Sequence, residues 1–412
     1  MPMVYRILRV TFLIWAGLVW ADSEDIAEAL PRLNLEHLVE EALTNNPDII
    51  ASLHDWKASQ AVIPQVQTLP DPRVALGYKD MASQEVMYGM SQAIPFPGKL
   101  RLKGEIASSE SERMEQDYLA TQLSVIARLK ELYFELHLVH KSVEVVSKNK
   151  LLLEDFEQTA NVRYSVGHAA QQDVLRAQTE ISRLLARLTT LDQRRQSIQA
   201  EINRLLNRAP GDPLGRPEEI WLHPMQHTLA ELNTLLDKSS PLLRGQQRAV
   251  ERDNRAIALA RREYYPDFEL SALGLRNTSM STDGYQVALN VRIPLFYATR
   301  QRKGVDEAVA NRESVFQDLQ ALRQELLARI KDNVARAESA QRLVKLLEEA
   351  IIPQSRLTLA SAQASYSVGK VDFLTLLNSL LTLQENELEF HAEMTAHEQA
   401  MARLEGLVGE TP

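Results

Sequence analysis

Apolar positions along the chain change their spacing from helical to strand-like and back. From 35 to 66 they recur every three or four residues, as in an amphipathic helix, with a break at Asn46-Pro47. The spacing then falls to two, with Val74, Leu76 and Tyr78 alternating with other residues. A second alternating run follows after a short polar segment. The pattern predicts a hairpin with strands at about 72–79 and 85–95.

The second half of the chain shows the same succession. Phe268 and Leu270 alternate with Glu269 and Ser271, and a longer run alternates up to 294. We therefore predict a second hairpin with strands at about 267–276 and 285–294. Long helical stretches follow each hairpin, at about 99–162 and 170–207 and again at about 301–364 and 371–407. The fold class is mainly α with a small β part.

The two halves also share short identical or similar segments, which indicates an internal repeat. Tyr164-Ser165-Val166-Gly167 recurs as Tyr366-Ser367-Val368-Gly369, an offset of about 202 positions. The other matches are Asn46-Pro47 with Ser240-Pro241, Pro70-Asp71 with Pro266-Asp267, and Ile94-Pro95-Phe96 with Ile293-Pro294-Leu295. We predict repeat 1 at 35–209 and repeat 2 at 229–409, joined by a linker at 210–228 that is rich in Pro and Gly.

The length of the predicted helices constrains their packing. A helix of about 60 residues is about 90 Å long, because each residue adds about 1.5 Å. Such helices are too long for the interior of a globule and are expected to pack side by side as coiled coils. A heptad-like seam supports this packing: Leu123, Ile126, Leu129, Leu132 and Tyr133.

Composition narrows the function classes. The chain has 412 residues with only 15 Gly and 17 Pro, which agrees with long uninterrupted elements. Its formal charge of −9 argues against general nucleic-acid binding, which depends on clustered Lys and Arg. With no cysteine in the sequence, disulfides, thiolate metal sites and a Cys-linked lipid anchor are excluded.

The N-terminal residues predict export. Arg6 and Arg9 precede an apolar run from 10 to 19, and Val19-Trp20-Ala21 follows as a cleavage site. We interpret residues 1–21 as a secretory signal peptide and 22–34 as the N-terminal segment of the mature chain. About ten apolar residues are too few for a membrane-spanning helix, which needs about twenty. An exported chain of this kind could enter a membrane only as strands.

The four strands suit a wall between lipid and water. They have one apolar face, and their other face carries polar residues such as Glu269, Gln286 and Asn290. Aromatic residues gather near their ends. Four strands cannot close by themselves, because the smallest barrels need about eight. Three copies of the chain, giving twelve strands, are the simplest closed arrangement with cyclic symmetry.

Taken together, these features resemble the TolC-type outer-membrane efflux family. The resemblance rests on the signal peptide, the twofold repeat, the two strands per repeat and the doubled Tyr-x-x-Gly segment between long helices. Arg163 precedes the first of these segments, and Asp173-Val174-Leu175 follows it. The segment from Ser91 to Lys99 (SQAIPFPGK) resembles the strand-to-helix junction of the heavy-metal branch of the family.

The resemblance implies a homotrimer in the outer membrane of the cell. Twelve strands would form a β-barrel in the lipid, and twelve helices would continue it as a tunnel through the periplasm. The duct would work with a periplasmic adaptor (membrane fusion protein) and an inner-membrane pump of the resistance-nodulation-division type. It implies no cofactor and no nucleic acid. Many relatives carry a lipidated N-terminal cysteine, which this chain lacks.

In this family the Tyr-x-x-Gly turns lie at the periplasmic tip of the tunnel. Glycine permits a tight helix-to-helix turn there, and the tyrosine ring packs on a neighbouring helix. Asp173 would form a carboxylate ring at the entrance in a trimer, which favours cations. The residues expected at the entrance or at the adaptor docking surface are Arg163, Tyr164, Gly167, Asp173, Tyr366, Gly369, Asp372 and Thr375.

Other chemistry has weaker support. His137 and His140, and His391 and His397, lack a third ligand in the sequence pattern, so no metal site is predicted. No Ser-His-Asp pattern or phosphate loop is present, so an enzyme is not expected. The leading hypothesis is a passive exit duct for heavy-metal cations. The alternatives are the same duct for drug efflux or type I protein secretion, and a periplasmic coiled-coil scaffold without a pore.

Overall fold

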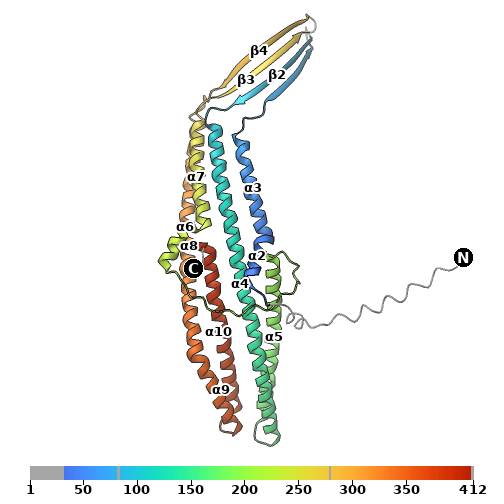
Figure 1. Cartoon of the computed structure of the whole chain (residues 1–412), viewed down its shortest axis with the longest axis vertical. Coiled ribbons are helices and arrows are strands. Elements are labelled where there is room, and N and C mark those ends of the chain that lie inside the picture. Colours follow the sequence, from blue (N-terminus) through green and yellow to red (C-terminus); the bar gives the residue numbers. More distant parts are fainter. Residues whose placement is uncertain (1–31, 81–83, 278–279, 410–412) are drawn as a thin grey trace, which may run out of the picture. The chain divides into compact units, whose positions relative to one another are not determined.

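The computed structural model describes residues 32–80, 84–277 and 280–409. The predicted signal peptide, 1–21, and all but the last three residues of the segment 22–34 lie outside the described residues. Over these residues the fold is mainly helical with four β-strands (Figure 1). Within the described residues, no helix is both long and apolar enough to cross a membrane.

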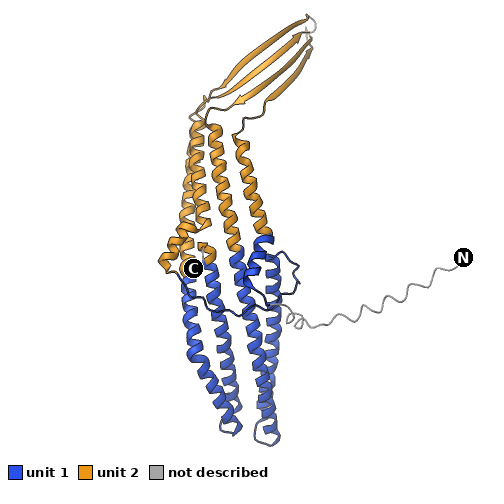
Figure 2. Ribbon diagram, in the orientation of Figure 1, with its two compact units in different colours: residues 1–46, 125–226, 333–404 blue, residues 47–124, 227–332, 405–412 orange. Residues whose placement is uncertain are grey.

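Contacts between residues divide the chain into two compact units (Figure 2). Unit 1 comprises 1–46, 125–226 and 333–404, and unit 2 comprises 47–124, 227–332 and 405–412. Each unit therefore takes residues from both halves of the sequence. The division of the chain into two sequence repeats stays a prediction, distinct from this division by contacts.

Each half begins with a short helix and a longer one, separated by a break before proline. The first pair is α2 (Leu35–Asn45) and α3 (Pro47–Gln67), and the second is α6 (Leu229–Ser239) and α7 (Pro241–Arg262). The intervening residues, Asn46 and Ser240, have extended backbones with ψ of 125° and 116°. A residue before proline avoids the helical region, which explains both breaks. Thr228 caps α6 in a capping box with Glu231.

The four strands form one antiparallel sheet in unit 2, in the order β1-β2-β3-β4. Their bounds are β1 Arg73–Asp80, β2 Gln84–Ile94, β3 Asp267–Asn277 and β4 Thr282–Arg292. β4 begins three residues before the predicted strand. Ser281 has a φ of 51°, and Asn277 Oδ1 accepts a hydrogen bond from the Met280 N–H, so the turn closes early and Asp283 and Gly284 belong to the strand.

The sheet has two chemically different faces. In one cross-strand row Leu76 is opposite Tyr88, which is opposite Gly274, which is opposite Tyr285. The side chains on this face are strongly exposed, with Leu76 at 82% and Tyr285 at 91%. The opposite face carries small and polar residues together with Met87, Leu273 and Leu275. β1 and β4 are the edge strands, and each pairs on one side only within the sheet.

Long helices follow each hairpin, and those of the second half begin 202 positions after those of the first. α4 (Lys99–Ser165) is one helix of 67 residues. The equivalent run, Gln301 to Ser367, consists of α8 (Gln301–Leu346), a π-helical turn η1 (Leu347–Ile351) and α9 (Ile352–Ser367). The second helices are α5 (Gln171–Leu205) and α10 (Phe373–Val408). The uninterrupted helix predicted at 301–364 is thus broken by a π-helical turn.

Proline explains the interruption. Pro353 has no N–H, and its ring would clash with the carbonyl of the residue four positions earlier in a regular α-helix. A π-helical turn widens the backbone at this point and removes the clash. The position 202 residues earlier is Leu151, and α4 continues through it without interruption.

An apolar core within unit 1 joins the helices that meet at the two turns. Its members come from α4, α5, η1, α9 and α10 and are largely inaccessible to water. The fully buried residues include Val146, Leu153, Ala160, Ala177 and Phe373, each at 0% exposure. Of the predicted heptad-like seam, Leu129, Leu132 and Tyr133 are buried, and Leu123 and Ile126 are partly exposed.

Candidate functional site: the paired helix turns

The two Tyr-x-x-Gly segments form the same helix-ending motif. The His168 N–H donates to the Arg163 carbonyl at 2.8 Å, and the Gly167 N–H donates to the Tyr164 carbonyl at 3.0 Å. The equivalent bonds in the second turn run from Lys370 to Ser365 at 2.9 Å and from Gly369 to Tyr366 at 3.0 Å. Both patterns are Schellman motifs.

Glycine is required at both turns by the backbone. Gly167 and Gly369 each have a φ of +76°, a left-handed conformation that other residues rarely adopt. Their surroundings differ, however. A Cβ added at Gly167 meets nothing within 4 Å, whereas one at Gly369 lies 3.2 Å from the Arg163 guanidinium. The second turn is therefore the more tightly packed of the two.

Arg163 connects the two turns. Its guanidinium donates a hydrogen bond to the Tyr366 carbonyl and lies over the Tyr366 ring, 4.6 Å from the ring centroid. Cation–π contacts of this type stabilise by about 0.5–1 kcal/mol when exposed and by more when desolvated. The position equivalent to Arg163 in the second half is Ser365, which is too short to make the reciprocal contact with Tyr164.

The two tyrosines consequently have different environments. Tyr366 is 4% exposed and packs edge-on against Phe373 at the start of α10, with ring centroids 5.8 Å apart. Tyr164 is 43% exposed. Of the two rings, which were both expected to pack on a neighbouring helix, one is therefore buried and the other is exposed. The Tyr366 hydroxyl is buried and forms no hydrogen bond with the residues that the structure describes.

Electrostatics links Tyr366 to Asp173. Burial raises the pKa of the Tyr366 hydroxyl; Arg163 opposes the rise and Asp173 adds to it. Asp173 is the third residue of α5 and is partly buried. Its carboxylate makes no hydrogen bond or ion pair to any residue within the described ranges. A charged carboxylate and an unpartnered phenol thus occupy the same end of unit 1.

Asp372 and Thr375 have a local structural role. The Thr375 N–H donates to Asp372 Oδ1 at 3.0 Å, and the Thr375 hydroxyl donates to the same oxygen. This arrangement caps the N-terminus of α10. These two hydrogen bonds, from the Thr375 hydroxyl first and then from its N–H, lower the pKa of Asp372. Asp372 is exposed and Asp173 is partly buried, so the two turns differ in their acidic residues as well.

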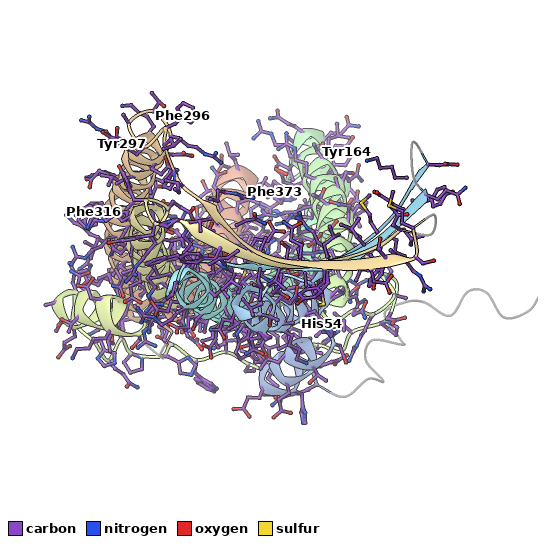
Figure 3. All side chains as sticks on the ribbon, turned by 90° about the horizontal axis from the view of Figure 1, so that it is seen from above. His54, Tyr164, Phe296, Tyr297, Phe316 and Phe373 are labelled. Carbon is purple, nitrogen blue, oxygen red and sulfur yellow. The ribbon has the colours of Figure 1, made fainter. Side chains whose placement is uncertain are left out.

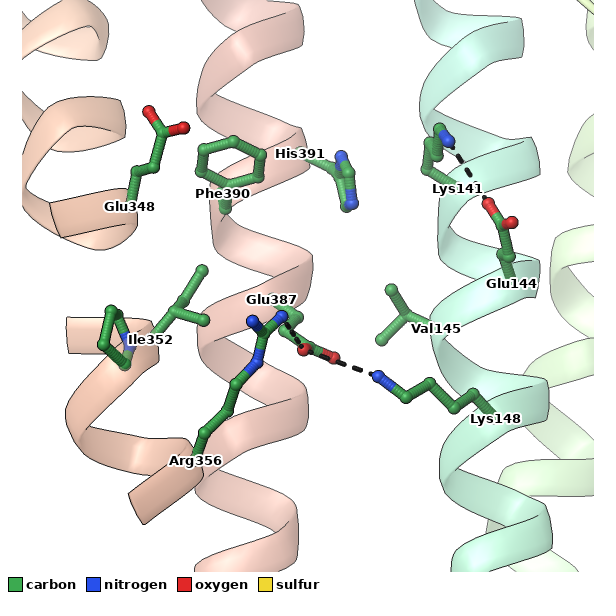
Figure 4. Close-up of a pocket in the computed structure, with 11 residues that line it drawn as sticks. Lys141, Glu144, Val145, Lys148, Glu348, Ile352, Arg356, Glu387, Phe390 and His391 are labelled. Carbon is green, nitrogen blue, oxygen red and sulfur yellow. Dashed lines mark hydrogen bonds and ion pairs between the residues drawn. The ribbon is translucent and has the colours of Figure 1, made fainter. Parts of the chain in front are cut away.

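A pocket of about 490 Å³ lies within unit 1 beside the π-helical turn (Figure 4). Its walls come from α4, η1, α9 and α10. The buried carboxylate of Glu387 accepts a hydrogen bond from Arg356 at 2.9 Å and lies 3.8 Å from Lys148 Nζ. Glu387 therefore interacts with a basic side chain from each half of the chain, Lys148 from the first and Arg356 from the second. Sequence reasoning missed this site; its one signal was Pro353, the single proline in the run from 301 to 408.

The four histidines considered above as metal ligands, His137, His140, His391 and His397, are buried or partly buried. His137 Nδ1 lies 3.2 Å from the Glu218 carbonyl, and His397 Nδ1 lies 3.0 Å from Glu398. Burial lowers the pKa of His391 and of His137, and lowers that of His140 to about 4. In the part of the chain that the structure describes, no group of three or more His, Asp or Glu side chains is placed to hold a metal ion.

Comparison with known proteins places these features in a family. The family model described as "Outer membrane efflux protein" matches residues 38–208 and 233–410. The cobalt-zinc-cadmium resistance protein CzcC of Cupriavidus metallidurans is 21% identical over 397 residues, which cover 93% of this chain and 91% of CzcC.

Two solved structures show the same fold. CusC superposes with a TM-score of 0.81 at 15% identity, covering 93% of this chain and 97% of CusC. The outer membrane protein VceC of Vibrio cholerae superposes with a TM-score of 0.80 at 18% identity, covering 91% of this chain and 96% of VceC. The mainly helical fold with a small sheet, predicted from the sequence, is confirmed by these likenesses.

Proposed function

The chain belongs to the outer membrane efflux protein family, and from this premise we propose that it is the exit duct of a tripartite efflux system. Three copies would form a twelve-stranded barrel in the outer membrane, continued by a helical tunnel in the periplasm. A periplasmic adaptor and an inner-membrane pump of the resistance-nodulation-division type would deliver the substrate. The duct itself is a passive conduit.

One observation carries the proposal. The apolar face of the sheet is exposed over all four strands, and both edge strands are open. Exposed apolar surface of this extent marks a membrane or protein contact. An open strand edge cannot remain in lipid, because its unpaired N–H and C=O groups would have no partner. Lipid on the apolar face and further copies at the two edges satisfy both requirements.

The substrate class that we propose is heavy-metal cations. Support comes from the likeness to CzcC, whose name refers to cobalt, zinc and cadmium resistance. The partly buried Asp173 carboxylate adds to it, since a trimer would present this residue as a ring of negative charge at the tunnel mouth. Deletion of the gene should raise sensitivity to divalent metals; a strain with unchanged metal sensitivity and increased drug sensitivity would assign the duct to drug efflux.

The tip turns are proposed to hold the resting duct closed and to receive the adaptor. Tyr366→Phe removes only the buried hydroxyl, and Asp173→Ala removes the carboxylate that acts on it, so the double variant should raise single-channel conductance in planar bilayers severalfold. Tyr118→Phe is the matched control, because its hydroxyl bonds to Gln122 within α4 at 2.8 Å. Equal conductance of the double variant and the control would refute the closure role.

The same preparation tests the duct against a non-pore scaffold. The exposed apolar face predicts a detergent-dependent trimer that conducts ions. A protein that stays monomeric and soluble without detergent would instead be the periplasmic scaffold, and the duct would be excluded.

A further inference from the structure

The end of the first hairpin is locked onto the start of the second within unit 2. Lys99, the first residue of α4, is 3% exposed, and its Nζ donates to Asp267 Oδ1 at 2.9 Å and to Glu263 at 3.1 Å. The Phe96 N–H donates to the same Asp267 oxygen at 2.9 Å. We call this cluster, Phe96, Lys99, Glu263, Tyr265 and Asp267, the inner junction.

Aromatic packing completes the inner junction. The Phe96 and Tyr265 rings are stacked, with centroids 4.5 Å apart and planes inclined by 15°. Arg262 lies over the Tyr265 ring at 5.8 Å and donates to the Pro97 carbonyl at 3.3 Å. A buried cation, an acceptor and a stacked ring pair thus fix the place where β2 and β3 meet. The residues on the two sides come from different sequence repeats.

Repeat symmetry predicts a second junction of the same kind. Asp267 corresponds to Asp71, since both follow a proline just before their strands. The end of the second hairpin, 293–300, corresponds to the end of the first. Within one chain these two segments lie at opposite edges of the sheet, because β1 and β4 do not pair. We call them together the outer junction.

Both sides of the outer junction are exposed in the part of the chain that the structure describes. Ile293, Leu295, Phe296 and Tyr297 are 60–76% exposed, and Figure 3 shows Phe296 and Tyr297 pointing away from the neighbouring helices. On the other side Asp71 is exposed. Neither Asp71 nor Arg300, which directly precedes α8, has an ion pair with any residue in the described ranges.

The strand edges fit each other in register. The pairing of β2 with β3, in which Gln92 is opposite Leu270 and Met90 is opposite Ala272, can be transferred by the repeat offsets to β4 and β1 of two copies. Val291 then comes opposite Val74, Leu289 opposite Leu76, and Val287 opposite Tyr78. All six side chains belong to the apolar face, so the transferred register keeps apolar residues on one side of the joined sheet.

We propose that the outer junction is formed between two copies of this chain, with Arg300 of one copy donating to the Asp71 carboxylate of the next. Leu295, Phe296 and Tyr297 become covered by the start of the first hairpin of that next copy, as Phe96 is by Tyr265. The inference rests on the proposed trimer and adds to it the register and the charged contact. We choose a second copy as the partner because the equivalent contacts, those of the inner junction, are formed between the two hairpins of one chain.

Cysteine pairs test the register without background, because the sequence contains no cysteine. Leu76→Cys with Leu289→Cys, and Ala75→Cys with Asn290→Cys, place the two thiols directly opposite each other across the copies. Opposed Cβ atoms lie about 4.5–5.5 Å apart, whereas positions shifted by two residues lie about 7–8 Å apart. At least one opposed pair should give tenfold more covalent trimer on oxidation than Leu76→Cys with Val287→Cys.

Charge variants test the contact. Asp71→Ala and Arg300→Ala should each speed trimer dissociation in detergent about tenfold, and Asp71→Arg combined with Arg300→Asp should restore most of the lifetime. Lys303→Ala is the matched control, because Lys303 pairs with Asp306 inside its own chain at 2.9 Å.

The outcomes separate the two proposals. If the unaltered protein is a monomer in detergent, the proposed duct fails. If it is a trimer in which the shifted cysteine pair reacts as well as the opposed pairs, or in which the charge swap restores nothing, the duct stands and the outer junction is wrong.

Discussion

The two long helical arms, 99–165 and 301–367, have the same length and equivalent positions in the sequence but differ in how they are held. α4 runs through its 67 residues without interruption, whereas the second arm contains η1 and Pro353. The first turn has an exposed tyrosine and open space around its glycine. The second has a buried tyrosine, a phenylalanine packed edge-on against it and an arginine from the first arm.

This difference shows that a repeat preserves the backbone more closely than the interactions. The Schellman motif, the positive φ and the helix length are the same in both arms, and these depend on local sequence. The contacts of the second turn depend on two residues without equivalents in the other repeat. These are Arg163, whose counterpart is Ser365, and Phe373, whose counterpart is Gln171. The second turn is therefore fixed to the first arm through Arg163, whereas the Tyr164 ring at the first turn is exposed.

The largest expected effect comes from the core beneath the second turn. Phe373 is 0% exposed, and its counterpart in the first arm is the exposed Gln171. Phe373→Ala should destabilise this end of unit 1 by about 3–5 kcal/mol, because it removes a buried ring and leaves a cavity.

Hydrogen exchange of the backbone amides from 366 to 380 measures this loss. A change of about 4 kcal/mol corresponds to about a thousandfold faster exchange, since each 1.4 kcal/mol is tenfold. Gln171→Ala, the matched variant, should change exchange around the first turn by less than about threefold. Equal effects in the two arms would mean that the turns are held alike.

Burial of histidine on the first arm predicts a pH dependence of intermediate size. His140 on α4 has a pKa lowered to about 4 by burial, then by Arg195 and Arg216, whereas Arg342 at the equivalent place in the second arm is exposed. In the unfolded chain the His140 imidazole binds a proton below about pH 6.5, whereas in the folded chain it stays neutral down to about pH 4. Stability is thus highest above pH 6.5 and falls as the pH drops toward 4.

Thermal unfolding across pH 4 to 7.5 checks the sign. We expect a loss of about 2 kcal/mol attributable to His140, discounted for its partial exposure. His140→Phe should flatten this part of the curve, whereas Arg342→Gln should leave it unchanged. A curve of unaltered slope in His140→Phe would place the dependence on the other buried histidines, His137 and His391, whose pKa values are also lowered by burial.

The sequence predicted the parts of the fold that have a local signal. Alternation located all four strands to within three residues, and Tyr-x-x-Gly located the turns, because each of these depends on neighbouring positions. The π-helical turn was not predicted. A proline indicates that a regular α-helix is disturbed, but it does not determine whether the helix ends, kinks or forms a π-helical turn. The observed bounds of the helices otherwise lie within three residues of those expected.

The candidate site was predictable only in part. Arg163 and Tyr366 could be named from their motif, but their contact joins residues 203 positions apart, which no local pattern encodes. The contacts of Lys99 and of Glu387 with residues far away in the sequence were likewise not predictable from a local pattern. Lys99 was visible in the segment SQAIPFPGK, yet its burial against Asp267 depends on the pairing of β2 with β3.

The smallest expected effect compares the two turn glycines directly. Gly167→Ala and Gly369→Ala each place a side chain at a φ of +76°, which costs about 1–2 kcal/mol. Gly369→Ala should cost about 1 kcal/mol more, because its Cβ would lie 3.2 Å from the Arg163 guanidinium and displace it from Tyr366. Adding Arg163→Ala to both variants should remove that extra cost while leaving the shared backbone cost. If the difference between the glycines persists without Arg163, the asymmetry of the turns lies in the backbone and not in this one contact.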